Sequence, residues 1–320
     1  MTCLILRPLA ALSTALALVL SPLSVSANAP VGGRDEARIY FFGNSLIHHL
    51  TDTDETTVPH WLAVMADHEG RDFAADGRFG FPRQFATELP PQTNWHFARV
   101  DKAWQPDQGD FRSAGFDTVI MNPENFIQYD RADRPYQGDN PDGASPLGAT
   151  MGVVDWVMAH ADAPQFLIYE GWADLHPYAR SFPATSREMA QYHRHAQGAY
   201  ARWYDDYVAR LAALRPEARV DLIPVGRVMS QVLSQEPLSQ IPVEALYSDL
   251  SPHGTETIYL LAAMITYGWI YQAPPPKGLP LPDTIDPAFA AAYDDTADRV
   301  WTLLQDAGLR DAVTAQDEAR

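Results

Sequence analysis

The sequence predicts an α/β fold, a three-layer α/β/α sandwich around a central parallel sheet of about five strands. Short runs of aromatic and β-branched residues, which are typical of buried strands, recur along the chain. Stretches with helical spacing lie between these runs, and strands that alternate with helices form parallel sheets covered on both faces. A chain of 320 residues is long enough for one such domain with sizeable loops.

The N-terminal residues 1–27 are predicted to be a signal peptide. Arg7 provides the positive start, and the apolar run Leu9–Leu20 is short for a bilayer crossing. Val25-Ser26-Ala27 is typical of a cleavage site. We therefore expect export to the periplasm or the medium, with residues 28–320 as a single domain. A retained membrane anchor is the alternative, and the short run and the cleavage pattern argue against it.

The composition excludes several classes of function. The formal net charge of −18 argues against nucleic acid and anionic membranes as partners. The single cysteine, Cys3, lies in the predicted signal peptide, so the mature chain has neither thiol chemistry nor a cysteine metal site. The oligomeric state stays open.

The strand predictions rest on apolar runs that end at turn residues. In chain order they are Arg38–Phe42, Asp72–Asp76, Asp117–Met121, Gln165–Glu170 and Arg219–Pro224. One further strand, Trp95–Val100, is expected within the proline-rich loop region 81–115. In parallel sheets of this kind, ligands bind at the carboxyl ends of the strands. The loops after the first four strands are therefore expected to gather at one edge.

Helices are predicted where apolar residues recur with helical spacing between start and stop signals. Proline near the start and glycine past the end mark the first of them. They are Pro59–His68, Thr150–His160, Ser186–Leu214, Pro242–Tyr247, Thr255–Tyr271 and a C-terminal helix, Pro287–Leu309. Thr255–Tyr271 is apolar throughout, and a buried core helix is favoured over a membrane span. Residues 127–148, rich in Pro, Gly and Asp, are expected to be a long loop that forms a lid or a binding wall.

Ser45 is the candidate nucleophile. It follows the first strand and a glycine turn, in Gly43-Asn44-Ser45-Leu46. A serine there lies at the top of a sheet. If it also begins a helix, free N–H groups and the helix dipole favour an oxyanion beside it. The simpler interpretation is a helix-capping serine after a glycine turn.

His253 is the candidate base. It lies in the polar segment Tyr247–Gly254, directly before the apolar helix, and Asp249 four residues upstream is placed to accept a hydrogen bond from its ring. The alternative is that both residues only cap and turn the chain.

These positions resemble the blocks of the SGNH hydrolase (GDSL-like) family. Gly43-Asn44-Ser45-Leu46 is similar to the nucleophile block Gly-Asp/Asn-Ser-Leu, and Asp249 and His253 are similar to the Asp-x-x-His block with one extra residue between them. Gly80, with Gly77 as the alternative, matches the glycine that provides a backbone N–H after the second strand. Each motif is weak alone, and their order along most of the chain makes the set fairly specific.

The third block is only partly present. Of Gly-x-Asn-Asp, the segment Pro123-Glu124-Asn125-Phe126 keeps the asparagine alone. The resemblance implies a flavodoxin-like sandwich and ester hydrolysis, with Ser45 as nucleophile, His253 as base and Asp249 orienting it. In this family the acid sometimes contributes little, and a backbone carbonyl could replace it. The N–H groups of Ser45 and Gly80 and the Asn125 amide are implied as oxyanion donors.

No metal or organic cofactor is implied. The preferred substrate is a small acyl ester, such as an acetyl group on a carbohydrate. A lipid or aryl esterase, a non-catalytic glycan-binding protein on the same fold and an enzyme that transfers acyl groups to a glycan stay open as alternatives.

Several neighbouring residues have two interpretations each. Glu170 and Trp172 either bind a sugar by hydrogen bonding and stacking, or are a capping glutamate and a core tryptophan. Glu124 either contacts substrate or faces solvent. His48 and His49, soon after Ser45, either line the pocket or are solvated helix residues, and the second interpretation is favoured.

Overall fold

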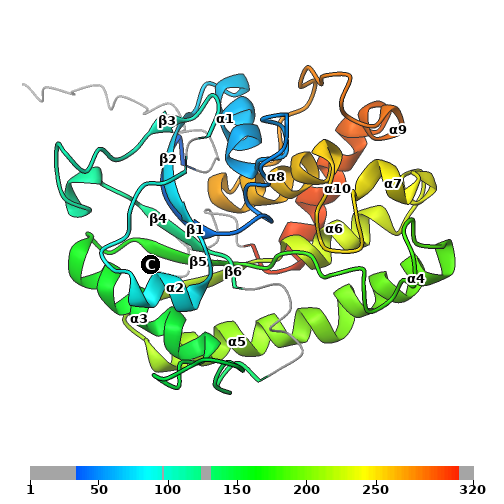
Figure 1. Cartoon of the computed structure of the whole chain (residues 1–320). Helices are drawn as coiled ribbons and strands as arrows, with labels where there is room; N and C mark the ends of the chain where they lie inside the picture. The colour runs from blue at the N-terminus through cyan, green and yellow to red at the C-terminus, as the bar shows by residue number, and fades with distance from the viewer. Residues whose placement is uncertain (1–33, 96, 124–130, 310–320) are drawn as a thin grey trace, which may run out of the picture. The chain divides into compact units, whose positions relative to one another are not determined.

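The structure, a computed structural model, describes residues 34–95, 97–123 and 131–309. They form a six-stranded parallel sheet with helices on both faces, which confirms the predicted α/β sandwich (Figure 1). The predicted signal peptide and the candidate residues Glu124 and Asn125 lie outside the described residues.

The strands run parallel in the order β3-β2-β1-β4-β5-β6. Their bounds are β1 Glu36–Gly43, β2 Asp72–Phe79, β3 Asp101–Lys102, β4 Thr118–Met121, β5 Gln165–Tyr169 and β6 Arg219–Ile223. Without the short edge strand β3, the order along the sheet is second, first, third, fourth, fifth, as in flavodoxin-like folds. The chain therefore reverses direction across the sheet between β1 and β4, where ligands bind in such folds.

All five principal strands occur where they were predicted, but the strand predicted at Trp95–Val100 is wrong. That segment is a loop, and only Asp101–Lys102 beyond it pairs with β2. Arg99 adopts a φ of 63°, a left-handed conformation that a strand does not hold. Trp95 and Phe97 are buried by packing on each other, so their apolar character reflects burial and not pairing.

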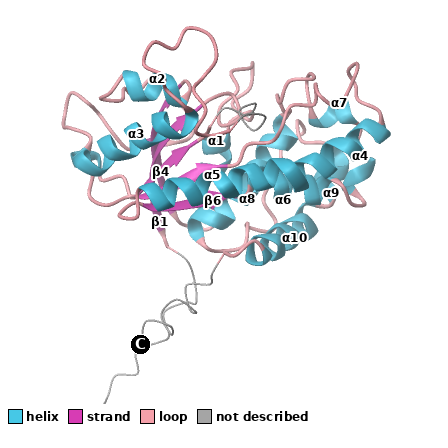
Figure 2. Cartoon of the chain, turned by 90° about the horizontal axis from the view of Figure 1, so that it is seen from below, coloured by secondary structure: helices cyan, strands magenta, loops and turns pink. Residues whose placement is uncertain are grey.

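Helices cover both faces of the sheet. Figure 1 shows one group on the side of α8 and another on the side of α3, and Figure 2 shows α3 and α5 from the second side. The first group is α1 Val58–His68, α6 Val225–Leu233, α7 Val243–Leu246, α8 Glu256–Tyr271, α9 Pro287–Ala291 and α10 Tyr293–Asp306. The second group is α2 Pro82–Thr87, α3 Pro146–His160, α4 Ser186–His195 and α5 Ala201–Leu214.

Helix α8 is the centre of the core. Every residue from Thr257 to Tyr271 is buried, because α1, α6 and α10 pack around it. A helix that is apolar all round needs such surroundings, so the interpretation as a core helix is confirmed. Across the described ranges, no helix combines the length and the apolar character that a bilayer crossing requires.

Other elements differ in their bounds. The long helical run from Ser186 contains a π-helical segment, Ala196–Tyr200, between α4 and α5. Helix α3 begins at Pro146, earlier than predicted, because Ser145 caps it by accepting from the Gly148 N–H at 3.1 Å. Region 81–115 also contains α2 and a 3₁₀ turn, Arg112–Ala114. The sequence did not predict α6.

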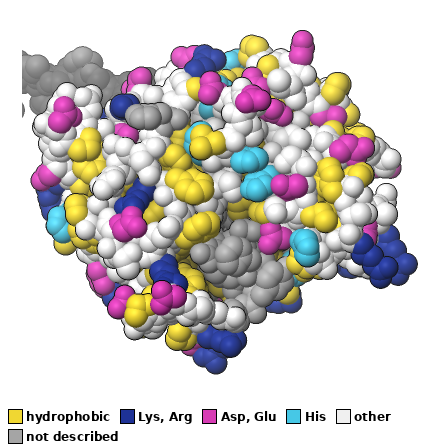
Figure 3. All heavy atoms as spheres, viewed as in Figure 1, with side chains coloured by type: hydrophobic (Ala, Val, Ile, Leu, Met, Phe, Trp, Pro, Cys, Tyr) yellow, Lys and Arg dark blue, Asp and Glu magenta, His cyan; other side chains and the backbone are white. Residues whose placement is uncertain are grey.

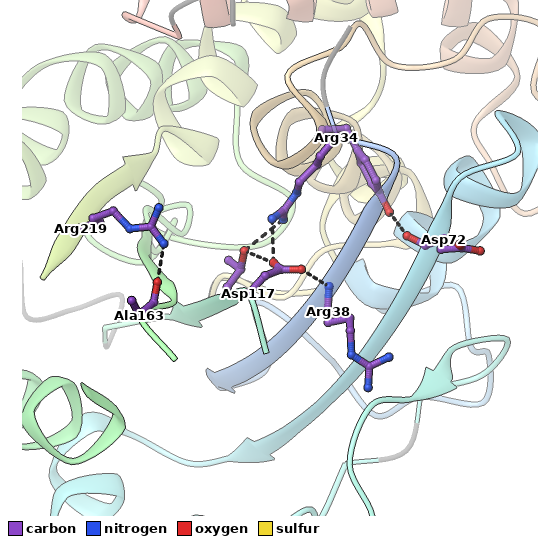
Figure 4. Close-up of polar contacts among 8 residues, drawn as sticks. Arg34, Arg38, Asp72, Asp117, Ala163 and Arg219 are labelled. Atoms are coloured by element: carbon purple, nitrogen blue, oxygen red, sulfur yellow. Dashed lines mark hydrogen bonds and ion pairs between the residues drawn. The ribbon is translucent and has the colours of Figure 1, made fainter. Parts of the chain in front are cut away.

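Ion pairs and hydrogen bonds fasten the amino ends of β1 and β4 to each other. Asp117 Oδ1 lies 2.7 Å from Arg34 Nη1, and Asp117 Oδ2 accepts from the Arg38 N–H at 2.7 Å (Figure 4). The candidate site lies at the opposite, carboxyl ends of the strands, because Ser45 follows the end of β1.

Candidate active site

Ser45 lies in a tight turn directly after β1. The Ile47 and His48 N–H groups both donate to the Asn44 carbonyl, at 2.9 and 3.1 Å. Asn44 Oδ1 accepts from the Leu46 N–H at 3.0 Å. The turn does not continue as a helix, because α1 begins only at Val58. Ser45 therefore does not begin a helix, and the condition under which a helix dipole would favour an oxyanion beside it is not met.

His253 and Asp249 meet in the loop before α8. The Nδ1 of His253 donates to Asp249 Oδ2 at 2.8 Å. The loop folds back on itself, since Tyr247 and Gly254 form an antiparallel bridge and the Ser248 N–H donates to the His253 carbonyl at 3.0 Å. This fold brings together two residues that are four apart outside any helix.

Two buried aromatic side chains connect this loop to Ser45. The hydroxyl of Tyr259, on α8, donates to the Ser45 carbonyl at 2.5 Å. The Trp172 indole N–H donates to the Pro252 carbonyl, next to His253, and its ring meets the Tyr259 ring edge-on at 5.5 Å. The candidate nucleophile and the candidate base are therefore held in one neighbourhood by α8 and by the chain after β5.

His49 belongs to the same group, a position closer to the less favoured of its two sequence interpretations. Its ring stacks on His253, with 4.3 Å between centroids and 12° between planes. Both His48 and His49 are half-buried and outside any helix, so the favoured interpretation of solvated helix residues is wrong. Burial lowers the pKa of both side chains, and the neighbouring His253 lowers the pKa of His49 further. The only sequence signal for this position is the pair of adjacent histidines soon after the candidate nucleophile, Ser45.

Glu170 and Trp172 lie in the core. Glu170 is fully buried, with its Oε2 2.7 Å from Arg227 Nε, and its Oε1 accepts from the Arg227 N–H at 2.7 Å, in the first turn of α6. Burial raises the pKa of Glu170 to about 7. Trp172 is 1% exposed. Both side chains are buried, which favours the interpretation as a capping glutamate and a core tryptophan.

The expected oxyanion donors are only partly available. The Gly80 N–H donates to the Gly43 carbonyl at 2.9 Å, so it is already engaged, and Asn125 is outside the described residues. Within the described chain, no hydrogen bond engages the Ser45 N–H. The Asn44 amide nitrogen is also a donor in this turn, buried and without a partner among the described residues.

The surface beside the site is partly apolar. Figure 3 shows histidine side chains near the middle of this face, with an acidic side chain and hydrophobic side chains beside them. The described residues include three exposed large apolar side chains, Leu50 (77%), Phe79 (44%) and Leu214 (48%). Leu50 follows His49, and Phe79 pairs in register with Gly43 at the end of β2. Two of the three therefore flank the Ser45 turn.

A metal site does not emerge from the described part of the chain. No group of three or more His, Cys, Asp or Glu side chains in these ranges is arranged to hold an ion. The side-chain groups described in this neighbourhood include a hydroxyl, two imidazoles and a carboxylate.

Neither a protein-family model nor a curated protein matches this chain. Among solved structures, it is similar to a DUF4886 family protein from Bacteroides uniformis, with 12% identity and a TM-score of 0.53 over 88% of this chain and 99% of that one. At this identity the likeness shows the fold alone. A carbohydrate esterase family 2 enzyme plus carbohydrate binding domain from Corynascus thermopiles (Myceliophthora fergusii) aligns with 15% identity, 73% of this chain, 65% of that one and a TM-score of 0.35, too low to support an argument about function.

Proposed function

We propose that this protein is a serine esterase in which Ser45 is the nucleophile and His253 the base. The observation that carries the proposal is the 2.8 Å contact between His253 Nδ1 and Asp249 Oδ2, on a loop that Trp172 and Tyr259 connect to the Ser45 turn. A hydroxyl, an imidazole and a carboxylate in this order form the arrangement that acyl transfer requires.

In the proposed reaction, His253 Nε2 takes the proton of the Ser45 hydroxyl as the oxygen attacks the acyl carbon. Asp249 holds the opposite ring nitrogen in its protonated form and stabilises the imidazolium that results. His253 then gives the proton to the departing alcohol, and water releases the acyl group by the same steps. The Ser45 N–H is available to the oxyanion, and one such donor typically contributes about 3–4 kcal/mol to transition-state stabilisation.

Hydrolysis of a short-chain activated ester tests this proposal. The purified protein is compared with Ser45→Ala and His253→Ala, and circular dichroism establishes that each variant is folded. We expect both substitutions to reduce kcat/KM by at least about 1000-fold. Wild-type hydrolysis no faster than that of the variants, on activated acetyl, butyryl and octanoyl esters alike, would contradict the proposal.

An acetyl ester of a carbohydrate is the substrate class that we propose first. Its support is the predicted export and the acidic composition. The side chains of Trp95, Trp104 and Trp172 add no support for a sugar substrate, because all three are buried. Product analysis with an acetylated oligosaccharide separates hydrolysis from two other outcomes. These are binding of a glycan without hydrolysis and transfer of an acyl group to a glycan.

An apolar ester is the second candidate, because Leu50 and Phe79 expose apolar surface beside the Ser45 turn. Isolated exposed leucines are common on protein surfaces, but two exposed apolar side chains that flank one site favour an apolar ligand. Activated acetyl and octanoyl esters distinguish the classes. If an apolar acyl chain binds there, Leu50→Ser and Phe79→Ser lower octanoate turnover about 10-fold and leave acetate turnover unchanged. An equal effect on both esters would contradict an acyl-chain site.

We also propose that the chain is exported and cleaved after Ala27, supported by the pattern of residues 1–27. N-terminal sequencing of the protein recovered from its native host tests this. A mature chain that begins at Asn28 is the expected result, and a retained Met1 in the cell pellet would contradict it.

A further inference from the structure

We propose that His49 is a positioning residue for His253: its ring, stacked face to face on the imidazole, holds the plane of the base. The inference rests on the proposed function of Ser45 and His253. The two rings are 4.3 Å apart between centroids and inclined by 12°, which places them in direct contact.

Two contacts together determine how the His253 ring lies. The hydrogen bond from Nδ1 to Asp249 Oδ2, 2.8 Å long, anchors one edge of the ring but allows it to rock about that bond. The flat face of His49 blocks this rocking on one side. A base that is held within a narrow range of orientations reaches the serine proton in productive geometry more often, which raises kcat.

His49 is itself held firmly at the base of its loop. Its N–H donates to the Thr56 carbonyl at 3.0 Å, and its carbonyl accepts from the Thr56 hydroxyl at 2.7 Å. Its Nδ1 is buried and has no hydrogen-bond partner among the described residues, so no polar contact of that nitrogen competes with the stack. The Tyr259 ring of α8 lies 6.5 Å away at 29°. The ring is therefore placed by its backbone and by stacking.

The proposed role of His49 depends on the charge of its ring as well as on its shape. Asp249 and His253 from the loop before α8 face it, together with the Tyr259 hydroxyphenyl group of α8 and the adjacent His48. Burial and the nearby His253 lower the pKa of His49, which favours the neutral form of its ring. A neutral ring does not oppose the imidazolium that forms on His253 in the transition state, whereas a fixed positive charge there would.

Three substitutions of His49 separate shape from charge. His49→Phe keeps a flat neutral ring and is expected to retain kcat within about 3-fold. His49→Ala removes the ring and is expected to lower kcat about 10-fold at little change in KM. His49→Lys places a charge beside His253: we expect kcat to fall about 100-fold, the acid limb of kcat/KM to move to lower pH and added salt to restore part of the loss.

Asp52→Asn is the matched control for charge. Asp52 is exposed on the same loop, and its substitution adds the same unit of positive charge as His49→Lys at neutral pH, away from the stack. We expect its kcat and pH profile to equal those of the wild type. A His49→Ala enzyme as active as the wild type, or a His49→Lys profile no different from that of Asp52→Asn, would overturn the inference.

A readout that needs no activity keeps this inference separate from the proposed function. Histidine NMR of the full-length protein in the Ser45→Ala background follows the titration of the His253 ring. Its midpoint is expected to lie lower in His49→Lys than in His49→Phe, while Asp52→Asn has no such effect. Equal midpoints in His49→Lys and His49→Phe would overturn the stacked contact even if the protein hydrolyses esters. Unequal midpoints without any ester hydrolysis support the contact and leave the proposed function contradicted.

Discussion

The His253 ring lies 2.8 Å from the Asp249 carboxylate although no helix places them side by side. The bridge between Tyr247 and Gly254 folds the loop so that residues four apart face each other. The extra residue relative to the Asp-x-x-His spacing therefore does not separate the pair.

Asp249→Asn tests whether this contact orients the base. An amide presents an N–H as well as an oxygen, so the imidazole loses its preferred tautomer and the imidazolium loses a charge partner. Because the Asp249 side chain is 46% exposed, solvent weakens the effect, and we expect kcat/KM to fall about 10- to 100-fold. Ser251→Ala, on the exposed part of the same loop, is the control. Unchanged hydrolysis in Asp249→Asn would reduce the pair to an ordinary surface contact.

Tyr259→Phe removes the hydroxyl that holds the Ser45 carbonyl. We expect the free energy of unfolding to fall by about 1 kcal/mol, and kcat/KM to fall about 10-fold because the serine turn loses its anchor. Tyr271→Phe is the matched control on the same helix. It removes a buried hydroxyl that donates to the Asp72 carbonyl at 2.9 Å, so it is expected to cost similar stability and no activity. Equal activities in the two variants, measured beside urea unfolding, would contradict the anchor.

The fold was predictable because a local pattern in the sequence marks each of its main strands. Runs such as Thr118–Met121 are buried on both faces and bounded by polar turns, so five strands and the parallel sheet follow from pattern alone. The failure at Trp95–Val100 has a clear cause: aromatic residues that pack in a loop resemble a strand in sequence. Arg99 has a positive φ, which interrupts an extended segment, and no pattern in the sequence indicates this conformation.

The candidate site was only half predictable. Ser45 and His253 could be proposed from the sequence because Ser45 directly follows a predicted strand and His253 directly precedes the apolar helix. The stack of His49 on His253 depends on how two distant loops meet, which no local pattern encodes. Glu170 follows a strand, as Ser45 does, but it forms a buried ion pair with Arg227. In both cases the deciding contact is long-range.

Gly171→Ala is expected to disturb the turn that contains Ser45 and Leu46. A Cβ at this position would lie 2.4 Å from Leu46 Cδ1 and 3.2 Å from Asn122 Nδ2, and Leu46 is buried and cannot move into solvent. We expect a loss of about 1–3 kcal/mol in the free energy of unfolding and reduced kcat, since Leu46 adjoins Ser45. In Gly152→Ala the nearest atom would be 3.7 Å away, inside α3, so this control is neutral or more stable by up to about 1 kcal/mol. Wild-type activity in Gly171→Ala would show that the turn tolerates movement of Leu46.

Arg227→Met should be the most destabilising of these changes, because it leaves the fully buried Glu170 carboxylate without its cation. We expect a loss of about 3 kcal/mol in the free energy of unfolding at neutral pH.

The pH dependence of stability gives a second test of this buried pair. Burial raises the pKa of Glu170 from its ordinary 4.5 to about 7, so between these values the folded protein holds a proton that the unfolded chain releases. The contribution of this residue to stability therefore falls as pH rises from about 4.5 to about 7, and Glu170→Gln removes that slope. Urea unfolding at a series of pH values measures it, with Glu217→Gln, an exposed position, as the control. Parallel pH curves for the wild type and Glu170→Gln would mean that Arg227 keeps the carboxylate ionised throughout.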